Sequence, residues 1–537
     1  MNLHDLVKEW NRPLRQGEGW VRLPVRTADG YTAGMTDLVG VIPAAGRGIR
    51  AYPHTEFLPK CLLEVDGVPL LRRNLELMRD QLGIRDVRVV IGHHGGKIRE
   101  FLGDGAWLGM QIELIENDRL DRELAYSIRL GVRDTSRPCF VMLSDECYVD
   151  GNHRDLVASA RPEALVTFGL VRSTSRLQVQ RNYIARIEGG RVVDLIEKPA
   201  DGSAAWMGVG SYLLQPEAAA RLEADFSRTE AAWPQDWTTW IGRLARDGAL
   251  VDAFHLNGQY VNVNDREALN RANHLVRNRD FSARTTSLVY VVDDAEDRVE
   301  EPVRAFADAE ELDEVLVVAR RSSTALDGLR SHPKVRVRVH DDPKVPLGII
   351  TREGLDAASG DILLTAYSDD SFAPRDLAKL LIYVRDADLV VGTRTTRQMI
   401  EQGSNMRGLA RAANVAIAKL LEILWWRFDS RFTDLNCVYR AFWRSTWTLI
   451  RDELTSPGVE IFPEMVIEVL RARRRVIEIP VHYCVRDADL EYVPSKYQNV
   501  RTLLRLVGLL LRKRVQAPGA SRARRSTPRQ AEGDASS

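Results

Sequence analysis

The stretch VIPAAGRGIRAYPHTEFLPK, residues 41–60, joins a short apolar run to a glycine-rich turn. An apolar run that ends in such a turn is typical of a buried β-strand, and the free backbone N–H groups of the turn can point at an anion. Gly46 and Gly48 can take positive φ and let phosphate oxygens approach the main chain, while Arg50 and Lys60 add mobile positive charge. The turn alone fits a plain strand-to-helix connection equally well.

From residue 37 onward, short apolar runs alternate with helix-like segments. A polar stretch near 271–286 interrupts the alternation, which then restarts. The apolar runs therefore form two groups. The first group is 38–44, 87–92, 111–116 and 139–143, and the second is 287–292, 314–319, 335–340, 361–366 and 388–393. The alternation predicts βαβ units and mostly parallel sheets covered on both faces. We therefore expect two tandem α/β domains, with these boundaries: leader 1–36, first domain 37–272, linker 273–285, second domain 286–515 and disordered tail 516–537.

Composition excludes several classes of protein. The 537 residues contain 75 lysines and arginines against 75 aspartates and glutamates, so no global charge favours nucleic acid. The five cysteines are scattered and form no C-x-x-C pair, which suits a reducing compartment without disulfides or structural zinc. Because no window approaches 18 uncharged apolar residues, we expect no membrane span and a cytoplasmic location.

The glycine turn belongs to a longer set of motifs. A-A-G-x-G-x-R at 44–50 is followed by L-P-K at 58–60 and D-G-V-P-L-L at 66–71. This pattern resembles the signature of sugar-phosphate nucleotidyltransferases. Further matches occur in the order that this family requires, at SDECYVD (144–150), IEKP (196–199), MGVGSYLLQP (207–216) and YVNVNDREAL (260–269). The resemblance covers residues 37–272 and implies transfer of a nucleotidyl group from a nucleoside triphosphate to a sugar or polyol phosphate.

The resemblance also implies roles for single residues. The main chain at Ala44, Ala45, Gly46 and Gly48 would hold the triphosphate together with Arg50, and Lys60 would lie near the reacting phosphates. Asp145 and Asn264 would bind Mg²⁺ (or Mn²⁺). Glu197 would accept hydrogen bonds from substrate hydroxyls, and Lys198 would bind the substrate phosphate.

Three of these assignments have plain alternatives. Asp145 could cap a turn, and Glu197 with Lys198 could be a solvated surface pair. Asn264 rests on a short V-N-D-R segment alone. The S-D-E sequence at 144–146 resembles the branch that acts on phosphocholine or inositol phosphate with CTP.

The second group of runs carries another set of motifs, namely DADLVVGTR (386–394), TDLNCVYRAF (433–442), GVEIFPEMVIEVL (458–470) and VPSKYQNVRTLL (493–504). These segments resemble family-2 glycosyltransferases of the dolichyl-phosphate mannose synthase type. With the first resemblance, they imply two Rossmann-like, three-layer domains of the GT-A type. They also imply glycosyl transfer from a nucleotide-activated donor to an acceptor, with a lipid phosphate as one candidate.

This second resemblance implies that the acidic pair after the run at 361–366 binds a metal and takes part in catalysis. The implied residues are Asp369 and Asp370 for the metal, Asp370 for catalysis, Asp434 and Arg440 for donor or acceptor phosphate, Glu460 and Glu464 for the pocket, and Lys496 for the diphosphate. A solvated turn is the alternative for the acidic pair.

The second domain also departs from its family. VDDAE at 292–296 replaces a Pro-x-x-Asn-Glu element, Ala319–Arg320 replaces an Asp-Asp pair, and Ser368 stands at the first position of the D-x-D motif. These losses indicate an altered donor or a domain that no longer catalyses. The basic, amphipathic segment 498–515 could lie on the inner face of a membrane as a peripheral contact, or pack on the core with its arginines exposed.

Three hypotheses follow from the sequence. The favoured one is a bifunctional transferase, in which the first domain makes an activated donor and the second transfers the activated group. In the second hypothesis only the nucleotidyltransferase is active, and the other domain binds. In the third, both domains are non-enzymatic sensors of nucleotide sugars.

Overall fold

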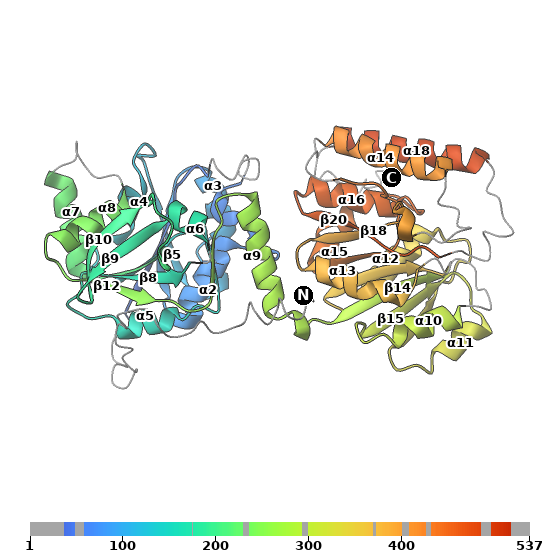
Figure 1. The fold of residues 1–537 in the computed structure, drawn as a ribbon, viewed down its shortest axis with the longest axis horizontal. Coiled ribbons are helices and arrows are strands. Elements are labelled where there is room, and N and C mark those ends of the chain that lie inside the picture. Colours follow the sequence, from blue (N-terminus) through green and yellow to red (C-terminus); the bar gives the residue numbers. More distant parts are fainter. Residues whose placement is uncertain are drawn as a thin grey trace, which may run out of the picture. The chain divides into compact units, whose positions relative to one another are not determined.

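The computed structural model describes residues 37–48, 58–173, 175–228, 236–292, 299–368, 372–399, 408–425, 431–484 and 496–516. The expected leader and nearly all of the expected tail lie outside these residues, as do Arg50, Asp369, Asp370 and the side chain of Lys496. The chain forms two compact units (Figure 1), of which the first comprises the residues up to 63 with 68–264, and the second 64–67 with the residues from 265 onward.

The first unit is built on a seven-stranded sheet of order β12-β8-β11-β6-β1-β4-β5. The strand β11 runs antiparallel to both of its neighbours, and the other pairs are parallel. The strands are β1 Val39–Ala44, β4 Asp86–Ile91, β5 Gln111–Glu116, β6 Cys139–Met142, β8 Val166–Arg172, β11 Trp206–Leu214 and β12 Val251–His255.

Helices cover both faces of this sheet. Successive residues of the fully buried strand β1 point to opposite faces: Ile42 packs in a cluster with Leu71 and Leu75 of α2, whereas Val41 packs with Ile128 of α4. The helices are α2 Leu70–Leu82, α3 Gly95–Leu102, α4 Leu124–Val132, α5 His153–Ser159, α6 Arg176–Arg181, α7 Pro216–Arg228 and α8 Trp237–Arg246.

Three two-stranded ribbons accompany the main sheets. They are β2 Glu64–Val65 with β3 Val68–Pro69, β7 Glu146–Val149 with β13 Gln259–Asn262, and β9 Tyr183–Glu188 with β10 Arg191–Glu197. The ribbon β7–β13 is antiparallel and joins the segment after β6 to the segment that ends the first unit.

The second unit has its own seven-stranded sheet, of order β16-β15-β14-β17-β19-β18-β20. Its strands are β14 Thr286–Val292, β15 Glu314–Ala319, β16 Val335–Val339, β17 Ile362–Tyr367, β18 Leu389–Thr393, β19 Arg440–Trp443 and β20 Val476–Pro480. Its helices are α9 Arg266–Arg279, α10 Glu300–Ala307, α11 Thr324–Leu329, α12 Leu347–Ala357, α13 Leu377–Val384, α14 Gly408–Leu424, α15 Arg444–Ile450, α16 Ile461–Arg471 and α18 Lys496–Val515.

The two large sheets have the same topology. When the strands of each sheet are numbered in chain order, both read 3-2-1-4-6-5-7, and in both the sixth strand is antiparallel to its neighbours. The order reverses between the first and fourth strands, and open α/β sheets bind ligands in the crevice at the carboxyl ends of such strands. In the first unit this point lies between β1 and β6.

The predicted α/β class with mostly parallel sheets is confirmed, and each predicted apolar run coincides with a strand to within a few residues. The stretch 273–285, expected as a linker, is instead helical as far as Arg279 and groups with the second unit. Asp265 caps this helix by accepting a hydrogen bond from a backbone N–H of its first turn, and its buried residues are Ala272 and Arg277. A helix with so few buried apolar residues shows little apolar periodicity in the sequence.

Helix α18 is anchored to the second unit by a buried cation. The Nζ atom of Lys513 lies 2.7 Å from Glu464 Oε1 and 2.7 Å from Glu468 Oε1, and it donates to the carbonyl of Glu453 over 2.7 Å. Burial opposes ionisation of Glu464, but the bond and charge of Lys513 together with the backbone N–H groups of Ser456 and Thr455 outweigh this effect and lower the pKa of Glu464. Among the helices in the described part of the chain, none combines the length and apolar content that crossing a bilayer requires.

We expect Lys513→Met to lower the free energy of unfolding of the second unit by about 3–5 kcal/mol, because it leaves the buried Glu464 without its cation and Glu468 with Arg471 alone. Urea unfolding of the full chain measures the loss. Arg514→Met is the matched control, since Arg514 is exposed one residue further along the same helix, and we expect its effect to stay within about 0.5 kcal/mol. Equal losses in the two variants would show that the buried ion pairs are not needed.

Candidate active site

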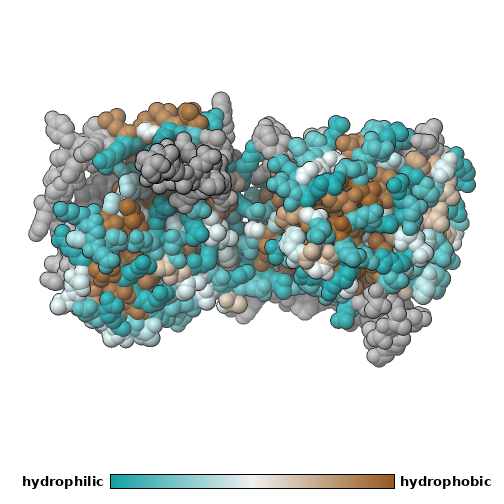
Figure 2. Space-filling view, turned by 180° about the vertical axis from the view of Figure 1, so that it is seen from behind, coloured by the Kyte–Doolittle hydropathy of each residue, from teal (hydrophilic) through white to brown (hydrophobic). Residues whose placement is uncertain are grey.

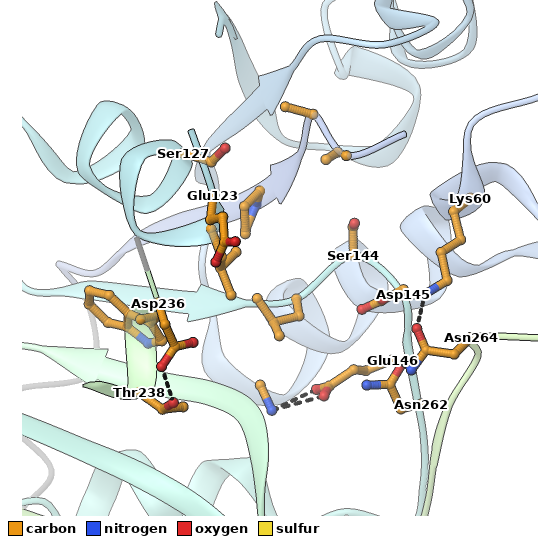
Figure 3. Close-up of a pocket in the computed structure, with 18 of the residues that line it drawn as sticks. Lys60, Glu123, Ser127, Ser144, Asp145, Glu146, Asp236, Thr238, Asn262 and Asn264 are labelled. Atoms are coloured by element: carbon orange, nitrogen blue, oxygen red, sulfur yellow. Dashed lines mark hydrogen bonds and ion pairs between the residues drawn. The ribbon is translucent and has the colours of Figure 1, made fainter. Parts of the chain in front are cut away.

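The first unit contains a cavity of ≈ 750 Å³ at the point where its strand order reverses (Figure 3). The end of β1 with its glycine turn forms one side, and the residues that follow β6 form the floor. The start of α4, the end of β10 and the start of α8 complete the lining. A cavity of this size can hold a nucleotide or sugar-sized ligand.

The glycine turn after β1 lines the cavity over residues 44–48. Gly48 takes a left-handed conformation with φ 62°, as expected for the turn, whereas Gly46 does not. A Cβ placed on Gly46 would meet no atom within 4 Å. The open space beside Gly46 therefore leaves its main chain accessible from the cavity. The carbonyl of Ala45 accepts a hydrogen bond from the backbone N–H of His93 over 3.2 Å, which ties the turn to the loop after β4.

Lys60, Asp145 and Asn264 meet at one edge of this cavity. Lys60 opens the short 3-10 helix Lys60–Leu62, and its Nζ atom donates to Asn264 Oδ1 over 2.6 Å and to Asp145 Oδ2. The main chain brings the two acceptors together, because the backbone N–H of Val263 donates to the carbonyl of Asp145 over 2.8 Å at the end of the β7–β13 ribbon. Figure 3 shows the three side chains pointing toward one another.

The oxygens of Asp145 and Asn264 suit a hard divalent cation. Both accept from the same ammonium group, so they converge on a site that already holds positive charge. A carboxylate and an amide oxygen are ligands that Mg²⁺ accepts, and Mg²⁺ completes its shell with water and substrate phosphate. No group of three or more His, Cys, Asp or Glu side chains within the described residues could enclose a metal by itself. The residues therefore fit a metal that arrives with the phosphates of a ligand.

Glu146, next to Asp145, is a buried carboxylate that ties three segments together. It accepts two hydrogen bonds from the backbone N–H of Gly210, at 2.8 and 3.0 Å, one from the hydroxyl of Tyr260 at 2.6 Å, and one from the hydroxyl of Tyr148. Burial and the neighbouring charge of Asp145 outweigh these bonds and raise the pKa of Glu146 to about 7. The carboxylate thus holds β7, β11 and β13 around the cavity.

The opposite wall carries Glu197 and Lys198. The hydroxyl of Thr238 lies 2.7 Å from Asp236 Oδ2 and 3.1 Å from Glu197 Oε2, so these three side chains form a polar group at the cavity wall. Lys198 Nζ lies 3.2 Å from Glu197 Oε1, and the backbone of Lys198 is left-handed with φ 44°. A side-chain-bearing residue in this region carries conformational strain, which occurs often at functional sites, and the Lys198 side chain is 64% exposed.

The structure brings most of the residues predicted for the first site to one cavity: Ala44, Ala45, Gly46, Gly48, Lys60, Asp145, Glu197, Lys198 and Asn264 all line it. Sequence reasoning missed others that line it, including Asn117, Ser127, Glu146, Asp236 and Thr238. Two of these had a local signal. Glu146 directly follows Asp145, and Asp236 stands at the cap position of α8, where it accepts a hydrogen bond from Thr239 N.

In the second unit, two of the predicted phosphate contacts are engaged internally. The guanidinium of Arg440 is fully buried and donates to the carbonyls of Leu435, Cys437 and Phe462. Asp434 is also fully buried and accepts two hydrogen bonds from the guanidinium of Arg394, at 2.7 and 2.9 Å. A phosphate would reach either side chain only after these bonds break, because neither group has a free face.

The two predicted pocket carboxylates of this unit also have partners. Glu464 accepts from Thr455 N over 2.9 Å and Ser456 N over 2.8 Å, besides its pair with Lys513. Glu460 lies 3.4 Å from the guanidinium of Arg505. These contacts hold the turn before α16 and the helix α18, so here the structure differs from the expected substrate pocket.

Comparison with known proteins gives the family. The model of the nucleotidyl transferase family matches residues 39–318, which is more than half of the chain, and the chain therefore belongs to this family. The match includes the whole cavity described above. It also continues beyond the first unit, into the first two strands of the second sheet.

Three relatives show how far the likeness extends. A glucose-1-phosphate thymidylyltransferase of Streptomyces antibioticus is 29% identical over 43% of this chain and 65% of its own length. A UTP–glucose-1-phosphate uridylyltransferase of Haloferax volcanii is 26% identical over 42% of this chain and 90% of its own length. A bifunctional IPC transferase and DIPP synthase of Aquifex aeolicus is 33% identical over 20% of this chain and 24% of its own length. The chain thus spans just under two thirds of the first of these relatives.

Proposed function

We propose that the first unit transfers a nucleotidyl group from a nucleoside triphosphate to a sugar or polyol phosphate and releases pyrophosphate. The observation that carries this proposal is the meeting of Lys60, Asp145 and Asn264 beside the glycine turn, at the reversal point of the sheet. Cations, hard oxygen ligands and free main-chain N–H groups in one cavity suit a reaction in which both substrates are anions.

In the proposed reaction, a phosphate oxygen of the acceptor attacks the α-phosphorus of the triphosphate. A new P–O bond forms to the acceptor, and the P–O bond to the β-phosphate breaks, so the electron pair leaves with pyrophosphate. Lys60 would neutralise charge on the reacting phosphates, and the main chain of 44–48 would hold the triphosphate. Mg²⁺ held by Asp145 and Asn264 would offset phosphate charge and stabilise the leaving group.

On the acceptor side, Glu197 would accept hydrogen bonds from substrate hydroxyls, and Lys198 would contact the substrate phosphate. The support is that both residues line the wall opposite Lys60 and that Lys198 has a left-handed, strained backbone. CTP leads the donor panel because of the S-D-E sequence, and dTTP and UTP follow because two relatives are named for those reactions.

We expect Asp145→Asn and Lys60→Ala each to lower kcat/KM for pyrophosphate release by at least about 10²-fold. The first removes the charged ligand of the proposed metal, and the second removes the cation beside the reacting phosphates. The assay is pyrophosphate release from purified full chain with each nucleoside triphosphate, Mg²⁺ and a panel of sugar and polyol phosphates. Asp155→Asn is the control, since Asp155 is an exposed carboxylate of the same unit on α5. Release that survives in both site variants would exclude the proposed site.

We expect Gly46→Ala to raise KM for the triphosphate by about tenfold while leaving the unfolding temperature unchanged. The new methyl group meets no protein atom but would occupy space that the main-chain nest offers to phosphate oxygens. KM and thermal unfolding are measured on the same preparations. Gly96→Ala is the matched control, because its Cβ also meets nothing within 4 Å and Gly96 does not line the cavity. Unchanged KM in Gly46→Ala would argue against a main-chain nest.

A second candidate function, glycosyl transfer by the second unit, is favoured by the sequence motifs at 386–394, 433–442, 458–470 and 493–504. The rival is a binding domain without catalysis, favoured by the internal bonds of Arg440, Asp434 and Glu464. A non-enzymatic sensor of nucleotide sugars is the third possibility, and it is tested by the pyrophosphate assay above.

If the second unit transfers a glycosyl group, Asp370→Ala should abolish turnover of the nucleotide-activated product when lipid phosphate acceptors are added. Loss of turnover is expected because this carboxylate would hold the metal that assists the leaving nucleotide. Turnover is followed by release of nucleotide from the product of the first reaction. Asp361→Ala, in the residue before β17, is the control, and turnover that persists in Asp370→Ala would place the metal elsewhere.

A further inference from the structure

Helix α18 presents two different faces. Leu506, Leu509, Leu510 and Lys513 are buried against the unit, whereas Leu504, Gly508, Leu511 and Val515 are exposed. The exposed residues follow one another at intervals of four, three and four, which places them on one side of the helix. Leu504 is 66% exposed, Leu511 51% and Val515 88%. The helix thus packs on the core and still leaves an apolar stripe facing outward.

The neighbouring helix α14 adds to this stripe. Its residues Ala412, Ala416 and Ile423 are exposed on one side, and Ile423 is 57% exposed. The helices α14 and α18 pack against each other along one edge of the unit (Figure 1). Figure 2 shows hydrophobic surface along that edge. We name the exposed apolar residues of these two helices the outer stripe.

The charged residues of α18 itself are all basic, although Arg505 lies 3.4 Å from Glu460. The exposed side chains of Arg505, Arg512 and Arg514 flank it on α18. Between residues 496 and 531 the sequence contains ten lysines and arginines and no aspartate or glutamate, although the whole chain is balanced at 75 of each kind. The acidic residue of α14, Glu422, is buried and lies 2.7 Å from Lys419. An apolar surface with a cationic border is complementary to an anionic surface that has an apolar interior.

We propose that the outer stripe docks the second unit onto the surface of an anionic lipid bilayer. The exposed leucines, valine and isoleucine would enter the boundary between headgroups and acyl chains, and the arginines would contact anionic headgroups. Because α18 is fixed to the unit by Lys513, docking would orient the unit as a body rather than tether it through a loose tail. This proposal is independent of the reaction proposed for the first unit.

The test is co-sedimentation of the full chain with vesicles of phosphatidylcholine alone and of phosphatidylcholine with phosphatidylglycerol. We expect binding that requires phosphatidylglycerol. Arg512→Gln with Arg514→Gln should weaken it by about 30-fold, since each cation near such a surface contributes about 1 kcal/mol. Leu504→Gln with Leu511→Gln should weaken it by at least about tenfold.

Ile382→Gln is the matched control, because Ile382 is 57% exposed on α13 of the same unit and belongs to no basic stretch. Each variant is also checked by thermal unfolding, so that a loss of binding is not mistaken for a loss of fold. Absent binding to anionic vesicles, or binding that the leucine variants leave unchanged, would overturn the proposal. So would a dimer in sedimentation velocity that the leucine variants dissociate, because the stripe would then bury itself against a second copy.

Discussion

The ammonium group of Lys60 donates to both Asp145 and Asn264, and the order of the strands in the first unit is what brings these three side chains together. Asp145 is 85 residues from Lys60 along the chain, and Asn264 is 204 residues away. Their meeting requires that β6 lie next to β1 and that the β7–β13 ribbon return the chain to the same edge. The reversal of strand order between β1 and β6 therefore creates the cavity and also supplies its charged edge.

The ribbon is itself held by a carboxylate that is costly to bury. The carboxylate of Glu146 loses its hydration on folding. Hydrogen bonds from donors on β7, β11 and β13 compensate for the lost hydration. A side chain that needs donors from three strands fixes those strands relative to one another.

The sequence was sufficient for the fold class and for much of the first cavity, because those features depend on local patterns. Buried parallel strands read as continuous apolar runs, and the turn at 44–48, Asp145 and Asn264 each follow such a run or a short strand. Asp236 and Thr238 were not predictable in this way, since their place at the cavity depends on how α8 packs beside β10. The helix α9 escaped prediction because it buries only Ala272 and Arg277, so its sequence carries little apolar periodicity.

In the second unit, polar groups beside the strands β18 and β20 satisfy one another. Arg394 pairs with Asp434, and Glu478 accepts from the backbone N–H groups of Thr433 and Asp434. Charges that are already paired gain little from a ligand, since each new contact must replace an existing bond. The first unit keeps its charges at the edge of an open cavity, whereas the described part of the second uses its charges to hold loops and helix α18 in place. Among the described residues, the charges of the first unit therefore meet at a cavity edge, and those of the second hold loops and a helix in place.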